Sequence, residues 1–141
     1  MGIRQSRPIN KNVNDATDVS DNDSDEFDHN IVSNSTVIGN FRFNLNFANK
    51  TAILEKNLSD EIYILIPSHV EYKKRLFTVK SIGENAFQET KKIYEIEFSP
   101  DSELQTIEKR AFCESSIESL IFPPHLKQIC ESAFEFCRNL K

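Results

Sequence analysis

The 141-residue sequence contains no tryptophan, a single methionine and only three glycines, and it has no surplus of positive charge. Its 17 basic residues are outnumbered by 22 acidic residues, which gives a formal net charge of −5. Because proteins that bind nucleic acids usually present a basic surface, we expect no nucleic-acid partner. So few glycines leave no glycine-rich loop that could cradle a phosphate group. No apolar run approaches the roughly 20 residues that a membrane-spanning helix needs.

Cysteine and histidine are also scarce, with three residues of each. Cys113, Cys130 and Cys137 have neither the spacing of a zinc-binding pair nor that of a redox C-x-x-C motif. We interpret them as small apolar residues of the interior. The histidines are scattered, and no serine, histidine and acidic residues share a pattern that indicates catalysis. We therefore predict no metal site, no cofactor and no enzymatic activity.

Residues 1–35 differ in composition from the remainder of the chain. They hold three basic and seven acidic residues, a net charge of −4, which leaves −1 for residues 36–141. Asparagine and aspartate dominate and there is little apolar surface to bury, which predicts a disordered acidic tail. The first residues, MGIRQS, match the N-myristoylation pattern with Gly2 as the acceptor. Such acylation would place the chain weakly at the cytoplasmic face of a membrane, and we expect no other membrane contact.

Residues 36–75 have the pattern of short β-strands. In the stretch FRFNLNF, Phe41, Phe43, Leu45 and Phe47 alternate with polar residues, which is the period of a half-buried strand. The stretch TAILE follows across an Asn-Lys turn and favours a β-hairpin. Two more stretches, EIYILIP and RLFTVKSI, have the composition of strands. We therefore predict an N-terminal antiparallel β cap built on this hairpin.

From residue 76 onward the sequence repeats itself. The heptads SIGENAF, TIEKRAF and QICESAF each place an isoleucine four residues before Ala-Phe, at spacings of 25 and 22 residues. Periods of this length indicate stacked structural repeats, in which each coil buries its apolar face against its neighbour. We predict that residues 76–141 form an incomplete repeat array. Phe87, Phe112 and Phe134 would then stack as an internal aromatic column.

These residues resemble the BspA-like leucine-rich repeat family, whose unit reads approximately I-x-x-x-A-F-x-x-C-x-x-L-x-x-I-x-L-P. The stretch ICESAFEFCRNL (129–140) matches it almost completely, with Cys137 at the cysteine position, and the resemblance covers about residues 61–141. It implies a β-rich, right-handed leucine-rich-repeat solenoid with short helical turns and short strands along one face. Members of the family are described as surface antigens or adhesion-type binding proteins, which implies a location at the cell surface. The motif carries no catalytic residues.

Solenoids of this kind bind partners through an exposed face of stacked strands. Because side chains alternate along a strand, Ile96, Phe98, Leu120 and Phe122 are expected to point inward. The outward positions are then the candidate binding residues, extended by alignment onto the preceding strand: Tyr63, Leu65, Glu95, Glu97, Ser119 and Ile121.

The pattern as a whole predicts a non-catalytic module that binds a protein partner, with surface recognition as the leading role. A lipid-anchored intracellular scaffold is one alternative, and acylation of Gly2 would distinguish it from surface recognition. Self-assembly is another, because the last coil stops at Lys141 before its strand and would leave apolar surface open. We accordingly expect either a fragment of a longer array or association through this open C-terminal coil.

Overall fold

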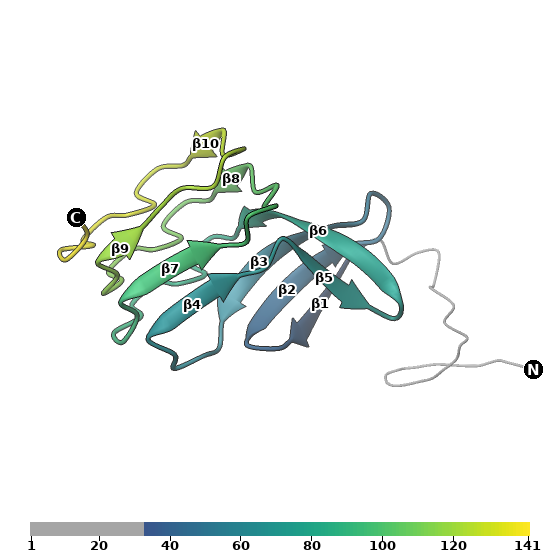
Figure 1. The fold of residues 1–141 in the computed structure, drawn as a ribbon, viewed down its shortest axis with the longest axis horizontal. Helices are drawn as coiled ribbons and strands as arrows, with labels where there is room; N and C mark the ends of the chain where they lie inside the picture. The colour runs from purple at the N-terminus through teal and green to yellow at the C-terminus, as the bar shows by residue number, and fades with distance from the viewer. Residues whose placement is uncertain (1–32) are drawn as a thin grey trace, which may run out of the picture. The chain divides into compact units, whose positions relative to one another are not determined.

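A computed structural model describes residues 33–141, so Gly2 and most of the expected acidic tail lie outside the described residues. The described residues form two β-sheets and no helix (Figure 1). The strands, in chain order, are β1 (Ser33–Ile38), β2 (Phe41–Asn46), β3 (Thr51–Asn57), β4 (Tyr63–Ile66), β5 (His69–Tyr72), β6 (Arg75–Ile82), β7 (Glu95–Phe98), β8 (Thr106–Ile107), β9 (Ser119–Leu120) and β10 (Gln128–Ile129).

The first three strands form an antiparallel unit. In β2, buried Phe41, Phe43 and Leu45 alternate with half-buried polar residues, as the sequence pattern predicts. The turn into β3 is closed by Asn46, whose Oδ1 accepts hydrogen bonds from the backbone nitrogens of Ala48 and Asn49 at 2.9 and 3.2 Å. The edge strand β1 begins at Ser33, three residues before the change in composition at residue 36, because pairing with β2 satisfies the backbone of this polar stretch.

Four strands of the larger sheet pair in parallel, in the order β3-β6-β8-β10. The isoleucines of the three repeated heptads lie in register, since Ile82 pairs with Ile107 and Ile107 pairs with Ile129. Each is therefore the same position of a successive coil. This register confirms that the heptads mark structural repeats.

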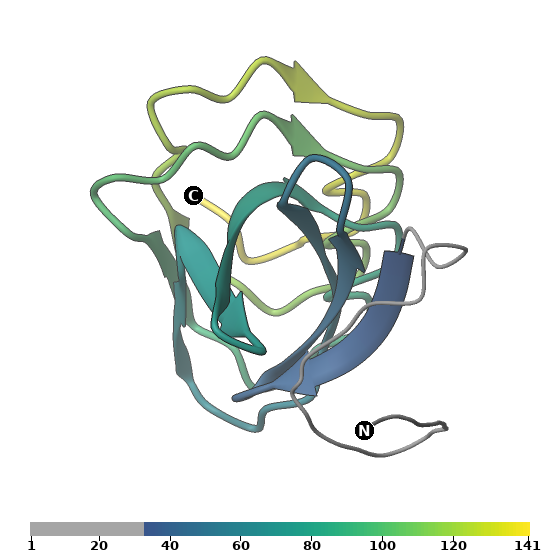
Figure 2. The ribbon, with the colours of Figure 1, turned by 90° about the vertical axis from the view of Figure 1, so that its right-hand side faces the viewer.

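The smaller sheet consists of the parallel strands β4, β7 and β9, which lie side by side in Figure 1. In register across them are Ile64, Ile96 and Leu120. Seen along the stack, the two sheets lie on opposite sides of the interior (Figure 2).

The position of β4 corrects the expectation that its stretch belongs to the antiparallel cap. After β3 the chain crosses over to the opposite sheet rather than turning back in a hairpin, so β4 pairs in parallel with β7. The stack of coils consequently begins one coil earlier than the sequence repeats indicate. The stretch RLFTVKSI becomes β6, which pairs antiparallel with β5 and parallel with β3 and β8.

The predicted aromatic column is present. The rings of Phe87 and Phe112 are stacked with centroids 4.9 Å apart, and those of Phe112 and Phe134 with centroids 5.0 Å apart. Phe41 of β2 covers the other side of Phe87 edge-on, at 6.3 Å. Because the first coil has no Ala-Phe pair, a ring from the N-terminal hairpin occupies the end of the column.

The short helical turns expected beside each Phe are not confirmed. The chain instead forms tight turns over residues 84–89, 109–114 and 131–136. In the first, the nitrogens of Ala86 and Gln88 donate to carbonyls three residues earlier, at 3.2 Å each. Left-handed residues flank the Phe in every coil and prevent a helix from propagating. These residues, with φ between 57° and 62°, are Asn85, Glu89, Arg110, Glu114, Ser132 and Phe136.

Candidate binding face

The outward side of β4, β7 and β9 carries the six residues that the sequence singles out, and we call it the ladder face: Tyr63, Leu65, Glu95, Glu97, Ser119 and Ile121. The parallel register aligns them in two rows across the strands. Tyr63 pairs with Glu95 and Glu95 with Ser119. Leu65 pairs with Glu97, and Ile121 directly follows β9 beside it. Adjacent strands of a sheet are about 4.8 Å apart, so the side chains within a row are neighbours.

The apolar members of the ladder face are unusually accessible. The exposed fractions are 66% for Tyr63, 58% for Leu65 and 83% for Ile121, whereas the inward residues Ile64 and Ile96 are buried. Glu97 is exposed, and Glu95 and Ser119 are half-buried. Large apolar side chains at this exposure, grouped on one side of a sheet, are typical of an interaction surface.

Phe122 departs from the expected alternation. It was expected to point inward, but its exposed fraction is 46%. β9 ends at Leu120, so the period of two is lost before Phe122. Its ring lies edge-on to that of Phe134, with the centroids 5.9 Å apart.

Tyr94 is a member of this surface that sequence reasoning missed. It precedes β7 and is partly exposed, and its ring meets that of Tyr63 edge-on at 5.9 Å. The backbone nitrogen of Tyr94 donates to the carbonyl of Ile62 at 2.8 Å, which aligns the approaches to β4 and β7. The sequence feature that could have identified Tyr94 is its position one residue before the strand. Strict alternation from Glu95 would have sent it inward, and this start of the strand is irregular.

A shallow depression lies along the outward side of β7 and β9. Its volume is about 250 Å³, and its lining includes four ladder-face residues: Glu95, Glu97, Ser119 and Ile121. Phe122 and the prolines Pro100, Pro123 and Pro124 are among its other apolar lining residues. This volume is below the roughly 300–1,000 Å³ of typical small-molecule sites. The depression therefore suits side chains of a larger partner better than an enclosed small ligand.

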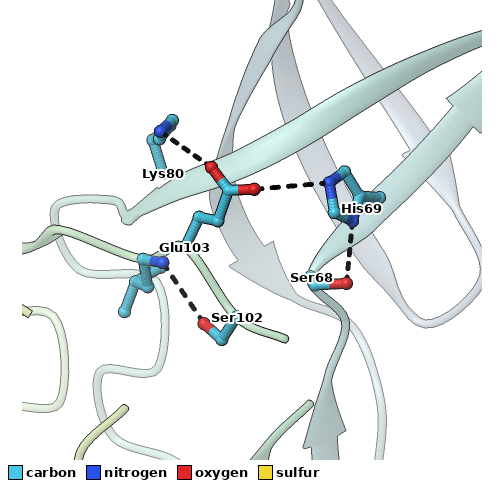
Figure 3. Close-up of polar contacts among 6 residues, drawn as sticks. Ser68, His69, Lys80, Ser102 and Glu103 are labelled. Carbon is cyan, nitrogen blue, oxygen red and sulfur yellow. Dashed lines mark hydrogen bonds and ion pairs between the residues drawn. The ribbon is translucent and has the colours of Figure 1, made fainter. Parts of the chain in front are cut away.

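The structure also assembles a polar cluster that the sequence did not reveal (Figure 3). Ser68 Oγ lies 2.8 Å from His69 Nδ1, and His69 Nε2 lies 4.0 Å from Glu103 Oε2. Lys80 Nζ contacts the other carboxylate oxygen of Glu103 at 3.3 Å. These residues come from the start of β5, from β6 and from the loop after β7, so only the stacking of coils brings them together.

This cluster has the order serine, imidazole, carboxylate, but its geometry favours a structural clasp over catalysis. Ser68 is buried, and its hydroxyl contacts the imidazole of the adjacent residue. A hydrolytic serine must instead present its hydroxyl to a substrate beside donors for the oxyanion. The ion pair of Lys80 with Glu103 joins two successive coils across their edge.

The three cysteines are free thiols. Cys113 is buried, as the sequence predicts, whereas Cys130 and Cys137 are partly exposed. Burial raises the pKa of the Cys113 thiol, and the carboxylate of Glu114 raises it further. Cys137 Sγ donates to the carbonyl oxygen of Phe112 at 2.8 Å, and burial raises its pKa as well. Within residues 33–141 no group of three potential ligands is arranged to hold a metal ion.

The last coil leaves apolar side chains accessible at its outer side. Ile129 and Phe136 are exposed, and Phe134 is only half-buried. Lys141 nevertheless continues the backbone hydrogen bonding between successive coils, because its backbone nitrogen donates to the carbonyl of Glu118 at 3.1 Å. In the part of the chain that the structure describes, no helix is long and apolar enough to cross a membrane.

Comparison with known proteins gives this geometry a context. Residues 68–141 match the family model described as "BspA type Leucine rich repeat region (6 copies)". No curated protein matches the chain in sequence. Two solved bacterial structures share its fold. The leucine-rich repeat protein TpLRR of T. pallidum superposes with a TM-score of 0.65 at 19% identity, over 76% of this chain and 48% of that protein.

The second structure is a leucine-rich cell surface protein of Faecalibacterium prausnitzii. Its TM-score is 0.51 at 20% identity, and the match covers 76% of this chain and 35% of that protein. The matched part of this chain thus corresponds to about half of the first protein and about a third of the second. At these identities the likeness concerns the fold.

Proposed function

Because the chain belongs to the BspA-type leucine-rich repeat family, we propose that it is a non-catalytic protein-binding module whose partner docks on the ladder face. The observation that carries this proposal is the exposure of Tyr63, Leu65 and Ile121 on a parallel sheet whose alternate side chains fill the core. Backbone pairing between the strands fixes the positions from which these side chains project, so docking requires little rearrangement of the backbone.

A location at the cell surface is part of this proposal. Support comes from the family and from the F. prausnitzii structure, whose protein is named as a cell surface protein. The competing location is the cytoplasmic face of a membrane, reached by acylation of Gly2. Intact-mass analysis of the natural N-terminus separates the two, because a myristoyl group on Gly2 supports the lipid-anchored scaffold.

Self-assembly is the second candidate function, and the accessible Ile129 and Phe136 of the last coil favour it. Two such ends could cover one another as successive coils do within the chain. Sedimentation at several concentrations tests this candidate. A Phe136→Arg variant should abolish any association that depends on the open coil.

The binding role is tested by substitution on the ladder face. A Glu97→Arg/Ile121→Arg variant should lose a partner that the wild-type chain retains, because it places two positive charges on the face. Val37→Arg is a matched control, since Val37 is an exposed apolar residue of β1 in the other sheet. Equal recovery of the partner by all three chains would exclude the ladder face as the binding surface.

A further inference from the structure

The charges of the ladder face indicate what kind of partner fits it, and this inference rests on the proposed function. Each of its two rows places a carboxylate directly beside an exposed apolar side chain. Glu95 pairs with Tyr63, and Glu97 pairs with Leu65. The arrangement repeats every two residues along the strands, a distance of roughly 6.6 Å.

Neither carboxylate is neutralised by a side chain of the part of the protein that the structure describes. Within residues 33–141, Glu95 and Glu97 have no hydrogen bond or ion pair from a side chain. Other glutamates at the edges of the coils do have such partners. Glu103 contacts Lys80 at 3.3 Å, and Glu118 contacts Lys141 at 3.4 Å. The centre of the ladder face therefore carries two formal negative charges that a cationic partner would neutralise.

The aromatic residues beside these carboxylates also favour a positively charged partner. Tyr63 and Tyr94 meet edge-on with 71° between their ring planes, and both are accessible, with exposed fractions of 66% and 42%. The face of an aromatic ring attracts cations, and guanidinium groups in particular stack on it. A cation bound between Tyr63 and Glu95 would thus be held by the ring and the carboxylate together.

The depression over β7 and β9 adds an apolar contact to this pattern. Both carboxylates line it, together with Ile121 and Phe122, and its volume is about 250 Å³. A partner that fits must therefore present cationic and apolar side chains at short intervals. An extended polypeptide that runs along the strands turns every second side chain toward the ladder face. It fits when the side chains on that side are alternately cationic and apolar.

We infer that the ladder face binds an extended basic segment of a protein, in which every second side chain faces the strands and these side chains are alternately cationic (arginine or lysine) and apolar. Its cations lie against Tyr63, Glu95 and Glu97, and its apolar side chains lie against Leu65 and Ile121. A glycan is the competing occupant, because sugars also stack on exposed tyrosines, and the experiment below treats it as an opposing outcome.

The test uses the full chain and two synthetic peptides, one with the repeat Arg-Ser-Leu-Ser and one with the repeat Glu-Ser-Leu-Ser, so that the charged side chain and leucine lie on the same side of the extended peptide. Binding is measured by fluorescence anisotropy at low and at high salt. The arginine peptide should bind and the glutamate peptide should not. Raising the ionic strength should weaken the arginine complex, because salt screens exposed charges.

Substitutions then locate the interaction. Glu95→Gln/Glu97→Gln should weaken binding of the arginine peptide about three- to tenfold, as expected for two exposed charge pairs. Tyr63→Ala should weaken it about two- to fivefold through loss of the ring–cation contact. Glu71→Gln/Glu84→Gln is the matched control, because it removes the same charge from exposed positions outside the ladder face and should leave affinity unchanged.

The outcomes separate this inference from the proposed function. If the arginine peptide fails to bind, or if both glutamine double variants behave alike, the basic-segment inference is overturned. Should a natural partner still be lost in Glu97→Arg/Ile121→Arg, the ladder face remains the binding surface with a different ligand. Salt-insensitive binding of a neutral oligosaccharide that depends on Tyr63 would replace the basic segment with a glycan.

Discussion

The rings of Phe112 and Phe134 are parallel to within 2°, with centroids 5.0 Å apart. This separation is close to the spacing of adjacent strands in a sheet, so the two rings follow the same step as the backbone of successive coils. The backbone nitrogen of Phe112 also donates to the carbonyl of Ala133 at 2.8 Å. The small alanine beside each Phe allows the turns to approach closely enough for both contacts.

The aromatic column predicts a graded loss of stability along the stack. Phe112→Ala should lower the free energy of unfolding by about 3–5 kcal/mol, because the ring is fully buried between two others. Phe134→Ala should cost clearly less, since its ring is only half-buried. Urea denaturation of both variants measures the difference. Equal losses would mean that the end of the column is covered in solution.

Gly83 should not tolerate a side chain. An added Cβ would lie 3.1 Å from Leu54 O and 3.1 Å from Ile53 Cγ2, and the backbone nitrogen of Gly83 already donates to Leu54 O at 2.8 Å. Gly83→Ala should therefore destabilise the chain by about 1–3 kcal/mol, because β3 and β6 must move apart.

Gly39→Ala is the comparison for this substitution. Gly39 has open space around it but a φ of 62°, so only backbone strain of about 1 kcal/mol is expected. Thermal unfolding of the two variants tests the order. A larger loss for Gly39→Ala would contradict the close approach of β3 and β6.

Left-handed turn residues predict an unusual preference for glycine. Glu89 is exposed and has a φ of 60°. Glu89→Gly should leave stability unchanged or slightly higher, whereas Glu89→Val should be lower than the glycine variant by about 1–2 kcal/mol, since β-branched residues are strained there. At Gln88, which lacks a positive φ, glycine should lose this advantage. Denaturant midpoints of Glu89→Gly, Glu89→Val and Gln88→Gly measure the effect.

The buried thiols predict a loss of stability in alkali. The pKa of Cys113 is raised above its ordinary value of 9.0, first by burial and then by Glu114. A thiol whose pKa is raised in the folded state makes its full contribution to stability at pH values below its ordinary pKa of 9.0. This contribution disappears as the pH rises through 9.0 toward the higher pKa of the folded state.

The wild-type chain should therefore lose more stability across this pH range than Cys113→Ala does. Urea midpoints of both chains, measured from below to above pH 9.0, check the expectation. Parallel pH profiles for the two chains would show that the thiol does not resist ionisation in the fold. Other groups that titrate in alkali affect both chains equally and cancel in the comparison.

Several features of the structure follow from local sequence patterns. The heptads around Phe87, Phe112 and Phe134 share an isoleucine four residues before Ala-Phe, and equivalent positions stack in register. The exposed positions of the ladder face follow from the alternation along β4 and β7. The binding role assigned to them stays a prediction.

The same patterns did not predict the contacts between segments that do not repeat. Phe41 closes the aromatic column from β2, and no periodic signal connects it with Phe87. Tyr94 joins Tyr63 on the ladder face, although alternation from Glu95 would have turned it inward. The clasp of His69, Lys80 and Glu103 likewise depends on how three separate segments meet.

The sequence by itself determined the repeat, its register and the aromatic interior, because every coil meets the same neighbour and must therefore present the same residue at the same place. Only the tertiary structure decided where the stack begins, which ring covers its first coil and which side chains accompany the carboxylates of the ladder face. Those choices depend on a single crossover from β3 to β4 and on contacts made once in the molecule. A contact that occurs only once in the molecule produces no periodic pattern in the sequence.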